Sequence, residues 1–527
     1  MKSGKLFHFL RSGRDGVPLS LFLLAGSILS ISWSIYFSLV TIAIPYQIEL
    51  REGSAQVVTR ILLSGGNPYT LENQPLAVNS YGLGYNLAVL PFAALFGNTL
   101  LVHRSVTFAF IVLSAMMVFA VVYKIRKDVH LALIGSAFVM IGLIGKAGNG
   151  AFSSAMGVFL FLASVLIPFL YSNNKGSLVL SAILVLAAFY TKPYFVLAFG
   201  IVASFLFLFV SKKKGVLYAL FFFVLLAASF VLVRLLFPLY FFNVLIVNSS
   251  MSWLSYAHMW NQLSNLFFRF WPMLLVSIIF LTKKQMEKKP ELSGVQIDKD
   301  LVNFLDWQSP LFKFAFDYCL YLFLCALLAF VFLLGRHMGN DMNYAYQLLI
   351  PTGMCWFGIK IDYGKKIPVL FTVLILINLF SWQGGLLDLG KLEQRNSKEW
   401  ARFYSYIQSA SNILNSQIEA SEVVRLGLTP IDTGQTIVYY QVKPFPDNLL
   451  VDASYETIAL DGFRYTKFID QSIQKQKFDL VVSVKEKGVF YHIKRLGEYY
   501  SVVDEIELVM PQSSQRWTVL IWKPGLK

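Results

Sequence analysis

Long apolar runs dominate this sequence and limit what it can fold into. Hydrophobic residues make up 56% of the 527 residues and charged residues only 14%. A run of roughly 18–25 apolar residues can cross a bilayer as a helix, because a helix satisfies its own backbone hydrogen bonds. About eleven such runs predict an all-α polytopic membrane domain. The expected spans are 18–45, 101–123, 131–145, 154–171, 177–191, 193–210, 216–238, 266–282, 317–335, 344–360 and 367–386.

The basic residues predict how these spans are oriented. Short cytoplasmic loops are enriched in Lys and Arg. If every basic cluster lies inside, the spans alternate without conflict, and the N-terminus is cytoplasmic. The loop 46–100 and everything after about residue 388 then lie outside, provided that Leu87–Phe96 rests on the outer surface and does not cross. The basic clusters are the N-terminus, 124–127, Lys175, 212–214, 283–289 and 365–366.

These clusters also account for most of the net charge of +15. No stripe of Lys and Arg interleaved with stacking aromatic residues lies on a soluble segment, so a nucleic-acid partner is not expected. The partner that the composition predicts is membrane lipid.

The composition divides the chain into two domains. Residues 1–387 form the expected membrane domain, and in residues 388–527 charged residues return to an ordinary frequency. The spacing of apolar residues predicts a helix over 396–417. Short strand-like runs follow, so the sequence predicts an extracytoplasmic α/β domain, large enough for its own core. The expected strands are Thr436–Val442, Leu449–Val451, Phe478–Val484 and Trp517–Trp522.

Two carboxylates stand directly after the first apolar run. In a helix over 47–63, Glu49, Glu52 and Gln56 lie on one face, and Gly65-Gly66 would end that helix. A carboxylate at the bilayer edge is costly to keep and is a functional candidate by default. It could accept a proton as a general base. Alternatively, it belongs to a solvated helix end, where nearby arginines pair with it.

The elements around this loop resemble the GT-C superfamily of integral-membrane glycosyltransferases. The likeness is strongest to bacterial members of the protein O-mannosyltransferase, aminoarabinose transferase and rhizobial core transferase group. It is carried by the acidic motif, Gly66-Asn67-Pro68-Tyr69, Tyr81-Gly82-Leu83-Gly84-Tyr85, Leu95-Phe96-Gly97 and Arg104, and more weakly by Thr191-Lys192 and Gly339–Tyr344.

The resemblance implies transfer of a sugar from a polyprenyl-phosphate donor to an acceptor outside the cytoplasm. The acceptor would be a lipid-linked glycan, an envelope polysaccharide or a protein, and the membrane a bacterial inner or plasma membrane. The lipid phosphate is the leaving group, so no nucleotide site is needed. The sequence accordingly has no Gly-rich phosphate loop of the Walker type.

The chemistry then needs a base for the acceptor hydroxyl and cations for the departing phosphate. Glu52 is the preferred base and Glu49 the second choice. The expected phosphate ligands are Arg104, Lys192, Arg336 and His337, although outer basic residues also extend to lipid headgroups. The expected substrate-loop residues are Asn67, Tyr69, Tyr81, Tyr85, Asn149, Asp341, Asn343 and Tyr344.

No metal is expected. Many relatives carry a second acidic residue in the next outer turn, where this chain has Asn149, and this puts a divalent cation bridging two acidic loops in doubt. The six histidines show no ligand spacing, so no structural metal is predicted.

Two other classes of protein have many spans. A transporter or flippase of lipid-linked sugars should contain broken helices or a two-fold repeat, and neither is visible in the sequence. A polysaccharide polymerase or ligase also combines many spans with a large outer loop. The acidic first loop favours the transferase.

Overall fold

The computed structural model describes the larger part of the membrane domain and parts of the C-terminal region. The described residues are 17–45, 47, 52–70, 81–146, 150, 153–247, 398–415, 471–485, 496–509 and 516–525, with short pieces between 253 and 337.

Each span expected between residues 18 and 238 coincides with helix. These are α2 (Val17–Ala43), α5 (Leu100–Arg126), α6 (Val129–Lys146), α7 (Ser154–Leu170), α8 (Lys175–Phe189), the run of η1 (Pro193–Val196), α9 (Leu197–Phe205) and η2 (Leu206–Val210), and α10 (Lys212–Leu236). Within the described residues, four helices are long and apolar enough to cross a membrane, and α6, α7 and α8 belong to a shorter apolar group. The spans expected after residue 265 lie almost entirely outside the described residues.

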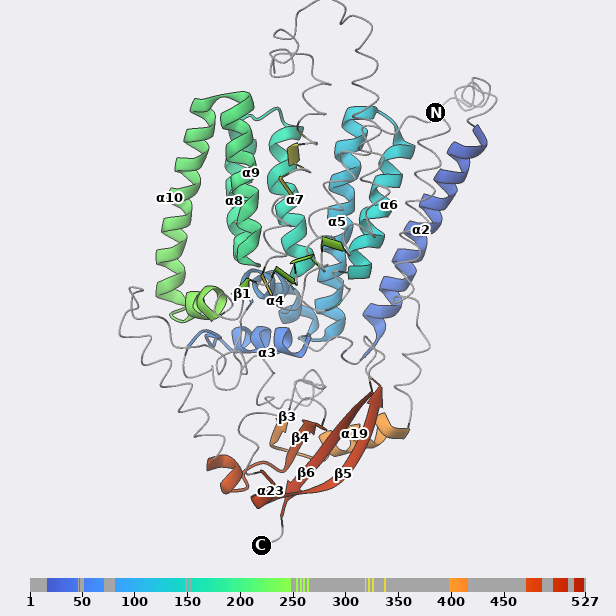
Figure 1. Ribbon diagram of the computed structural model, residues 1–527, viewed down its shortest axis with the longest axis vertical. Coiled ribbons are helices and arrows are strands. Elements are labelled where there is room, and N and C mark those ends of the chain that lie inside the picture. Colours follow the sequence, from blue (N-terminus) through green and yellow to red (C-terminus); the bar gives the residue numbers. More distant parts are fainter. Residues whose placement is uncertain are drawn as a thin grey trace, which may run out of the picture.

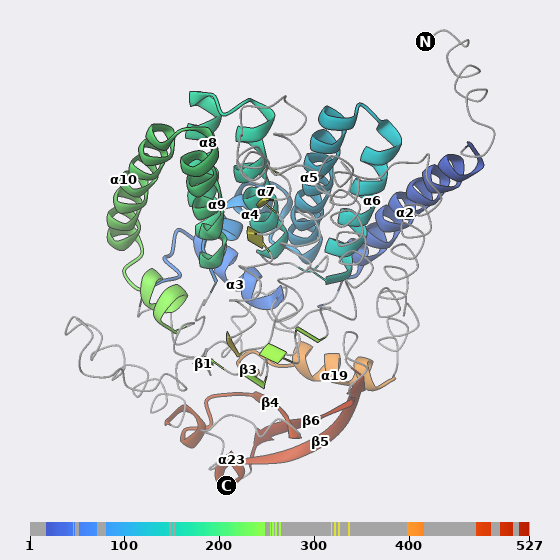
Figure 2. The same ribbon diagram turned by 45° about the horizontal axis from the view of Figure 1, so that its top comes forward.

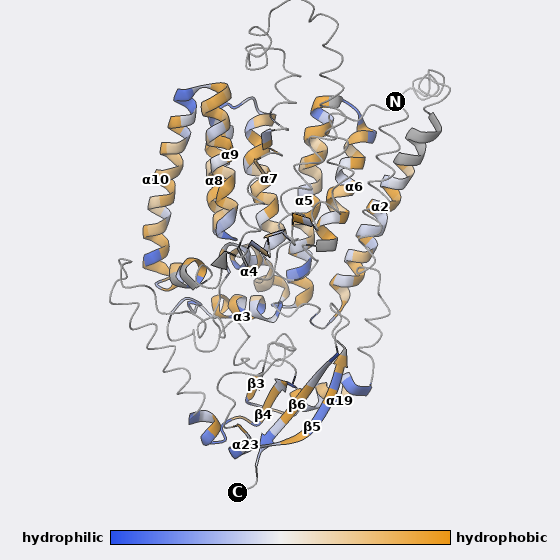
Figure 3. Cartoon of the chain, in the orientation of Figure 1, coloured by the Kyte–Doolittle hydropathy of each residue, from blue (hydrophilic) through white to orange (hydrophobic). Residues whose placement is uncertain are grey.

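The helices run alternately up and down the bundle (Figure 1). The start of α2, the α5–α6 turn, the start of α8 and the α9–α10 turn lie at one end. The α5–α6 turn, the start of α8 and the α9–α10 turn contain basic clusters, and Figure 3 shows hydrophilic turns there above apolar helices. We call the opposite end, where α2, α8 and α10 finish, the distal end.

Two helices lie at the distal end without crossing the bundle. α3 (Glu52–Leu63) runs across it, and α4 (Gly84–Phe96) lies between α3 and α5 (Figure 1). α3 begins at Glu52 and not at residue 47, and Gln47 is not helical. Its end follows the sequence: Gly65 has a φ of 73°, a left-handed conformation that glycine adopts without a steric penalty. Leu87–Phe96 therefore does not cross the bundle, as the alternation of spans requires.

The bundle core is formed by apolar side chains that meet between α5, α6, α7, α8, α9 and α10. Phe161, Phe195, Phe205 and Phe222 are among its largest fully buried side chains. Gly157 allows α7 to approach Phe195, because a Cβ on this glycine would lie 2.1 Å from the aromatic ring. Close packing of this kind fixes the helices relative to one another, and so it also positions their ends at the distal end.

The C-terminal region contains a four-stranded sheet. Its elements are α19 (Lys398–Gln408), β3 (Ile413–Asn415), β4 (Leu480–Val484), α23 (Leu496–Tyr499), β5 (Tyr500–Val509) and β6 (Arg516–Pro524). The strand order is β3-β4-β6-β5, with β3 parallel to β4 and the other pairs antiparallel. Trp400, Phe403 and Ile407 of α19 pack on one face. Figures 1 and 2 show the sheet beyond the distal end, away from the N-terminus.

The helix predicted over 396–417 is wrong in its second half. α19 ends at Gln408, and Ile413–Asn415 is strand. The chain turns because the Asp479 carboxylate accepts hydrogen bonds from the backbone N–H groups of Ser411 and Asn412. β6 covers the strand expected at Trp517–Trp522, and β4 most of that expected at Phe478–Val484. The other two expected strands and the boundary at 387 lie outside the described residues.

Candidate functional site

Glu52 and Arg104 form a buried ion pair at the distal end. Arg104 Nε donates to Glu52 Oε1 at 2.8 Å, and Nη2 donates to Oε2 at 2.7 Å. Both side chains are 0% exposed. A two-bond contact between guanidinium and carboxylate is strong and directional. The preferred base and one of the expected phosphate ligands therefore bind each other.

The same guanidinium caps the end of α2. Arg104 Nη1 donates to the carbonyl oxygens of Thr41 at 3.1 Å and Ile44 at 2.7 Å. The last carbonyls of a helix have no donor within the helix, and a cation there also complements the helix dipole. One side chain of α5 thus joins the end of α2 to the start of α3.

A second set of buried polar contacts, not predicted from the sequence, fixes α3 against α4. Asn86 Nδ2 donates to the Ala55 carbonyl at 2.9 Å and to Thr59 Oγ1 at 3.0 Å. Asn86 is 4% exposed, and Thr59 is fully buried. The buried face of α3 is therefore largely polar, and hydrogen bonds hold the helix in place.

The start of α5 is joined to α3 in the same way. Gln56 Nε2 donates to the Asn98 carbonyl at 3.1 Å, and Asn98 Nδ2 donates to the Gln56 carbonyl at 2.8 Å. His103 Nε2 lies 2.9 Å from Asn98 Oδ1. Polar residues inside apolar runs, such as Asn86 and His103, were the signal that could have revealed this network.

Tyr85, the last residue of the Tyr-Gly-Leu-Gly-Tyr element, is an anchor inside this network. It is 2% exposed. Its hydroxyl donates to the His103 carbonyl at 3.1 Å and lies 3.2 Å from Thr107 Oγ1. These contacts hold the start of α4 against α5.

The two glycines of that element let the chain touch the end of α8. Gly82 N–H donates to the Thr191 carbonyl at 3.2 Å, and Gly84 N–H donates to the Tyr190 carbonyl at 2.8 Å. A Cβ on Gly82 would lie 2.1 Å from the Tyr190 oxygen. Only glycine fits so close to the carbonyls that α8 leaves unsatisfied at its end.

This contact brings Tyr81 to Lys192. The Lys192 ammonium lies 5.5 Å from the centre of the Tyr81 ring, within the range of a cation–π contact. It also donates to Ser154 Oγ at 2.7 Å, at the start of α7. Lys192 and Tyr81 are both partly exposed. We call Tyr81, Ser154 and Lys192 the lysine cluster.

The Asn-Pro-Tyr turn attaches the segment after α3 to α10. Asn67 Oδ1 accepts from the Tyr69 N–H at 2.9 Å, and Asn67 Nδ2 donates to the Leu236 carbonyl at 2.6 Å. Tyr69 is fully buried, and its hydroxyl donates to the Tyr81 carbonyl at 2.8 Å. The turn thus also supports the residue that faces Lys192.

Several predicted site residues cannot be placed in this arrangement. Glu49, Asn149, Asp341, Asn343 and Tyr344 lie outside the described residues. Arg336 and His337 are described as backbone only, in β2 (Arg336–His337), which pairs antiparallel with β1 (Trp253–Leu254). Among the described residues, no group of three or more His, Cys, Asp or Glu could hold a metal ion.

Comparison with known proteins shows which fold this is. No protein-family model and no curated protein matches the sequence. Among solved structures, a crystal structure of ArnT from Cupriavidus metallidurans bound to undecaprenyl phosphate is 11% identical. The match covers 94% of this chain and 97% of that chain, with a TM-score of 0.52.

Two further solved structures match with lower TM-scores. The apo state of the same ArnT is 12% identical, with a TM-score of 0.48 over 94% of this chain and 97% of that chain. The archaeal oligosaccharyltransferase AglB from Archaeoglobus fulgidus, in complex with an inhibitory peptide and a dolichol-phosphate, is 11% identical, with a TM-score of 0.44 over 86% and 69%.

The likeness to undecaprenyl-phosphate-bound ArnT extends over nearly the whole length of both chains. At this level of identity it establishes the fold alone. The chain therefore shares the fold of this ArnT, in agreement with the GT-C resemblance that the sequence motifs predicted.

Proposed function

We propose that this chain, with its GT-C fold, is a membrane glycosyltransferase. It moves a sugar from a polyprenyl-phosphate donor to an acceptor at the distal end. The observation that carries the proposal is the likeness to ArnT over 94% of the chain. That ArnT structure is bound to undecaprenyl phosphate, a lipid of the class proposed for this donor.

The lysine cluster is the proposed site for the donor phosphate. Lys192 is partly exposed at the distal end and held by Ser154 and Tyr81. An ammonium has three donors, so it can keep the contact with Ser154 and still donate to a phosphate oxygen. As the bond from the anomeric carbon to the phosphate breaks, the phosphate gains charge. A fixed cation stabilises that charge.

Glu49 becomes the proposed general base, in place of Glu52. Both carboxylate oxygens of Glu52 accept hydrogen bonds from Arg104, and the side chain has no exposed surface. A base must come within about 2.6–3.2 Å of the proton that it removes. Glu49 stands three residues earlier in the same acidic motif. The proposed role of Glu52 is to fix α3 through Arg104.

In the proposed step, the base takes the proton of an acceptor hydroxyl while that oxygen attacks the anomeric carbon. The new glycosidic bond forms as the bond to the phosphate breaks, and the polyprenyl phosphate leaves. A single displacement of this kind inverts the anomeric centre. The acceptor oxygen and the leaving oxygen then lie on opposite faces of the sugar ring.

The test compares two matched variants, Glu49→Gln and Glu52→Gln, in the full chain reconstituted in lipid nanodiscs. A positioned base contributes on the order of 10²–10⁴-fold to the rate. Glu49→Gln should therefore lower transfer by that factor with unchanged folding, whereas Glu52→Gln should lose stability. If Glu49→Gln transfers sugar at the wild-type rate, Glu49 is not the base. If the wild-type chain transfers no sugar from any polyprenyl-phosphate donor, the proposed function fails.

A further inference from the structure

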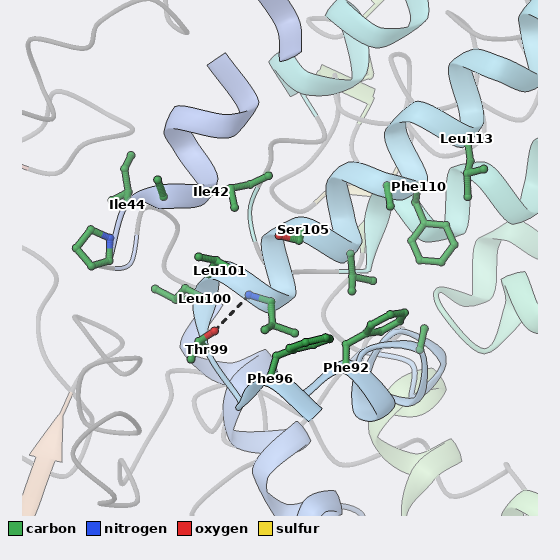
Figure 4. A pocket seen from close by; sticks show the side chains of 16 residues that line it. Ile42, Ile44, Phe92, Phe96, Thr99, Leu100, Leu101, Ser105, Phe110 and Leu113 are labelled. Carbon is green, nitrogen blue, oxygen red and sulfur yellow. Dashed lines mark hydrogen bonds between the residues drawn. The ribbon is translucent and has the colours of Figure 1, made fainter. Parts of the chain in front are cut away.

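An apolar groove lies at the distal end, on the far side of α4 from the lysine cluster. It is a cavity of about 940 Å³ between α4, α5 and the end of α2. This volume is in the upper part of the usual range for ligand pockets, roughly 300–1,000 Å³. Figure 4 shows Phe92 and Phe96 side by side on α4, with Ile42 and Ile44 from α2 at another edge.

The groove follows the helical repeat of α4 and α5. It is lined on α4 by Ala88, Phe92 and Phe96; on α5, beyond Leu100 and Leu101 at the helix start, it is lined by Val102, Ser105, Val106, Ala109, Phe110 and Leu113. These positions repeat every three or four residues, so each set forms one helix face. From Val102 to Leu113 the groove is about 16 Å long, at 1.5 Å per residue. It is therefore an elongated slot parallel to a membrane-spanning helix.

The groove opens beside a helix that is long and apolar enough to cross a membrane. α5 is one of the helices that can cross a membrane. Side chains at the opening are exposed: Phe92 is 46%, Phe96 71% and Leu101 54% exposed. Among the described residues that line it, Thr99 and Ser105 are the polar ones and none is charged. A slot with this shape and chemistry fits an extended hydrocarbon chain that enters sideways from the bilayer.

The charges at the distal end separate this groove from the proposed donor site. Arg104 lies beside the groove but is fully buried against Glu52. The partly exposed Lys192 lies beside the start of α4, where Gly84 donates to Tyr190. The groove residues of α4 lie at increasing distance from Gly84 along the helix, from Ala88 at about 6 Å to Phe96 at about 18 Å, at 1.5 Å per residue. A phosphate-bearing donor thus fits the start of α4, and the described lining of the groove carries no charge towards the other end.

We infer that the groove between α4 and α5 binds the hydrocarbon chain of a membrane lipid, and that this lipid accepts the sugar. The inference rests on the proposed function, since only a transferase has an acceptor. It narrows the acceptor to a lipid or a lipid-linked glycan. The headgroup would leave the groove near Ile44 and Thr99, at the distal end.

Photo-crosslinking of the full chain in nanodiscs tests the groove itself. The probe is a phospholipid with a diazirine at the end of its acyl chain, which shares the chain of the proposed acceptor and not its headgroup. Peptides with Phe92, Phe96 and Leu113 should be labelled well above the background on the outward face of α10. Ala109→Phe fills the groove at an exposed position. Displacing two methylene groups should lower labelling about tenfold.

Two controls make the result specific. Ala227→Phe adds the same side chain at an exposed position of α10 and should leave groove labelling unchanged. Ala88→Phe blocks the groove from α4 and should repeat the effect of Ala109→Phe. The inference is overturned if groove labelling does not exceed the α10 background. It is equally overturned if undecaprenyl phosphate with a diazirine in its chain labels the groove and displaces the phospholipid.

Transfer measurements complete the test. With a membrane lipid extract as acceptor, Ala109→Phe should raise the KM for the acceptor about tenfold and leave kcat nearly unchanged. Sugar that reaches only protein or polysaccharide would overturn the acceptor assignment. Labelling of the groove by a chain that transfers no sugar contradicts the proposed function, and with it the acceptor role. Labelling without transfer therefore contradicts the proposed function, whereas loss of labelling contradicts the lipid groove.

Discussion

The distal end contains two cations, Arg104 and Lys192, that the sequence analysis both expected to bind phosphate. The structure places them in different surroundings. Arg104 is fully buried, and it contacts Glu52 and the carbonyls of Thr41 and Ile44 at the end of α2. Lys192 is partly exposed and contacts a hydroxyl and an aromatic ring. A guanidinium that already donates two hydrogen bonds to a carboxylate holds helices together. An ammonium group that is partly exposed has three donors, so it can also bind an anion.

The largest expected effect is a loss of stability when the buried ion pair of Glu52 and Arg104 is broken. Glu52→Gln leaves the Arg104 guanidinium buried without its counter-charge, which should cost about 3–5 kcal/mol of stability. Thermal unfolding in nanodiscs measures the loss. The double variant Glu52→Leu with Arg104→Met removes both charges and should recover much of it. A stable Glu52→Gln protein that has lost only transfer would return Glu52 to the role of base.

The next effect concerns the exposed site. Lys192→Ala removes a charge-assisted hydrogen bond to phosphate that typically contributes about 1.5–3 kcal/mol. Binding of undecaprenyl phosphate should weaken by roughly 10–150-fold, with little change in unfolding temperature. Lys213→Ala, an exposed lysine in the first turn of α10, is the matched control and should bind normally. Equal binding by both variants would show that Lys192 contacts lipid headgroups only.

A smaller effect tests how the exposed site is supported. Gly82→Ala would put a Cβ 2.1 Å from the Tyr190 oxygen, so the loop must shift. Overpacking of this kind typically costs about 1–3 kcal/mol. Part of the loss should appear as weaker binding of undecaprenyl phosphate, because Tyr81 moves with the loop. Gly26→Ala, where nothing lies within 4 Å of the added Cβ, should be neutral. Wild-type stability of Gly82→Ala would contradict the close approach.

The smallest effect isolates the aromatic partner of Lys192. Tyr81→Leu removes a cation–π contact worth about 0.5–1 kcal/mol at a partly exposed position. Binding of undecaprenyl phosphate should weaken roughly two- to fivefold. Tyr81→Phe retains the ring and should behave like the wild type. If Tyr81→Phe is as weak as Tyr81→Leu, the phenol hydroxyl and not the ring supports the site.

Local features of the sequence predicted much of the membrane domain. Apolar runs located α2 and α5 to α10, and Gly65 ended α3. These signals act within one helix, where the sequence spacing sets the geometry. Strand β3 was missed because its fate depends on pairing with β4 and on the Asp479 carboxylate, both more than 60 residues away along the chain.

The sequence predicted several residues of the site, but it did not predict which of them contact each other. The sequence motifs contain Glu52, Arg104, Tyr81 and Lys192. The structure brings all four to the distal end. The pairing of Glu52 with Arg104 joins positions 52 residues apart, and no local pattern encodes it. Asn86 and His103 indicate that buried polar contacts exist, but a single polar residue in an apolar run does not identify its partner.

Arg104 also constrains how the chain enters the membrane. If the N-terminus stays in the cytoplasm, as the basic loops predict, Arg104 at the outer end of α5 must be carried across the bilayer. An unpaired Arg at the centre of an inserting helix costs roughly 2.5–3.5 kcal/mol. Its partners Glu52, Thr41 and Ile44 all precede it in the chain and reach the far side first. With that orientation, the insertion of α5 would bring Arg104 to partners that are already in place and would join α2 and α3 in one step.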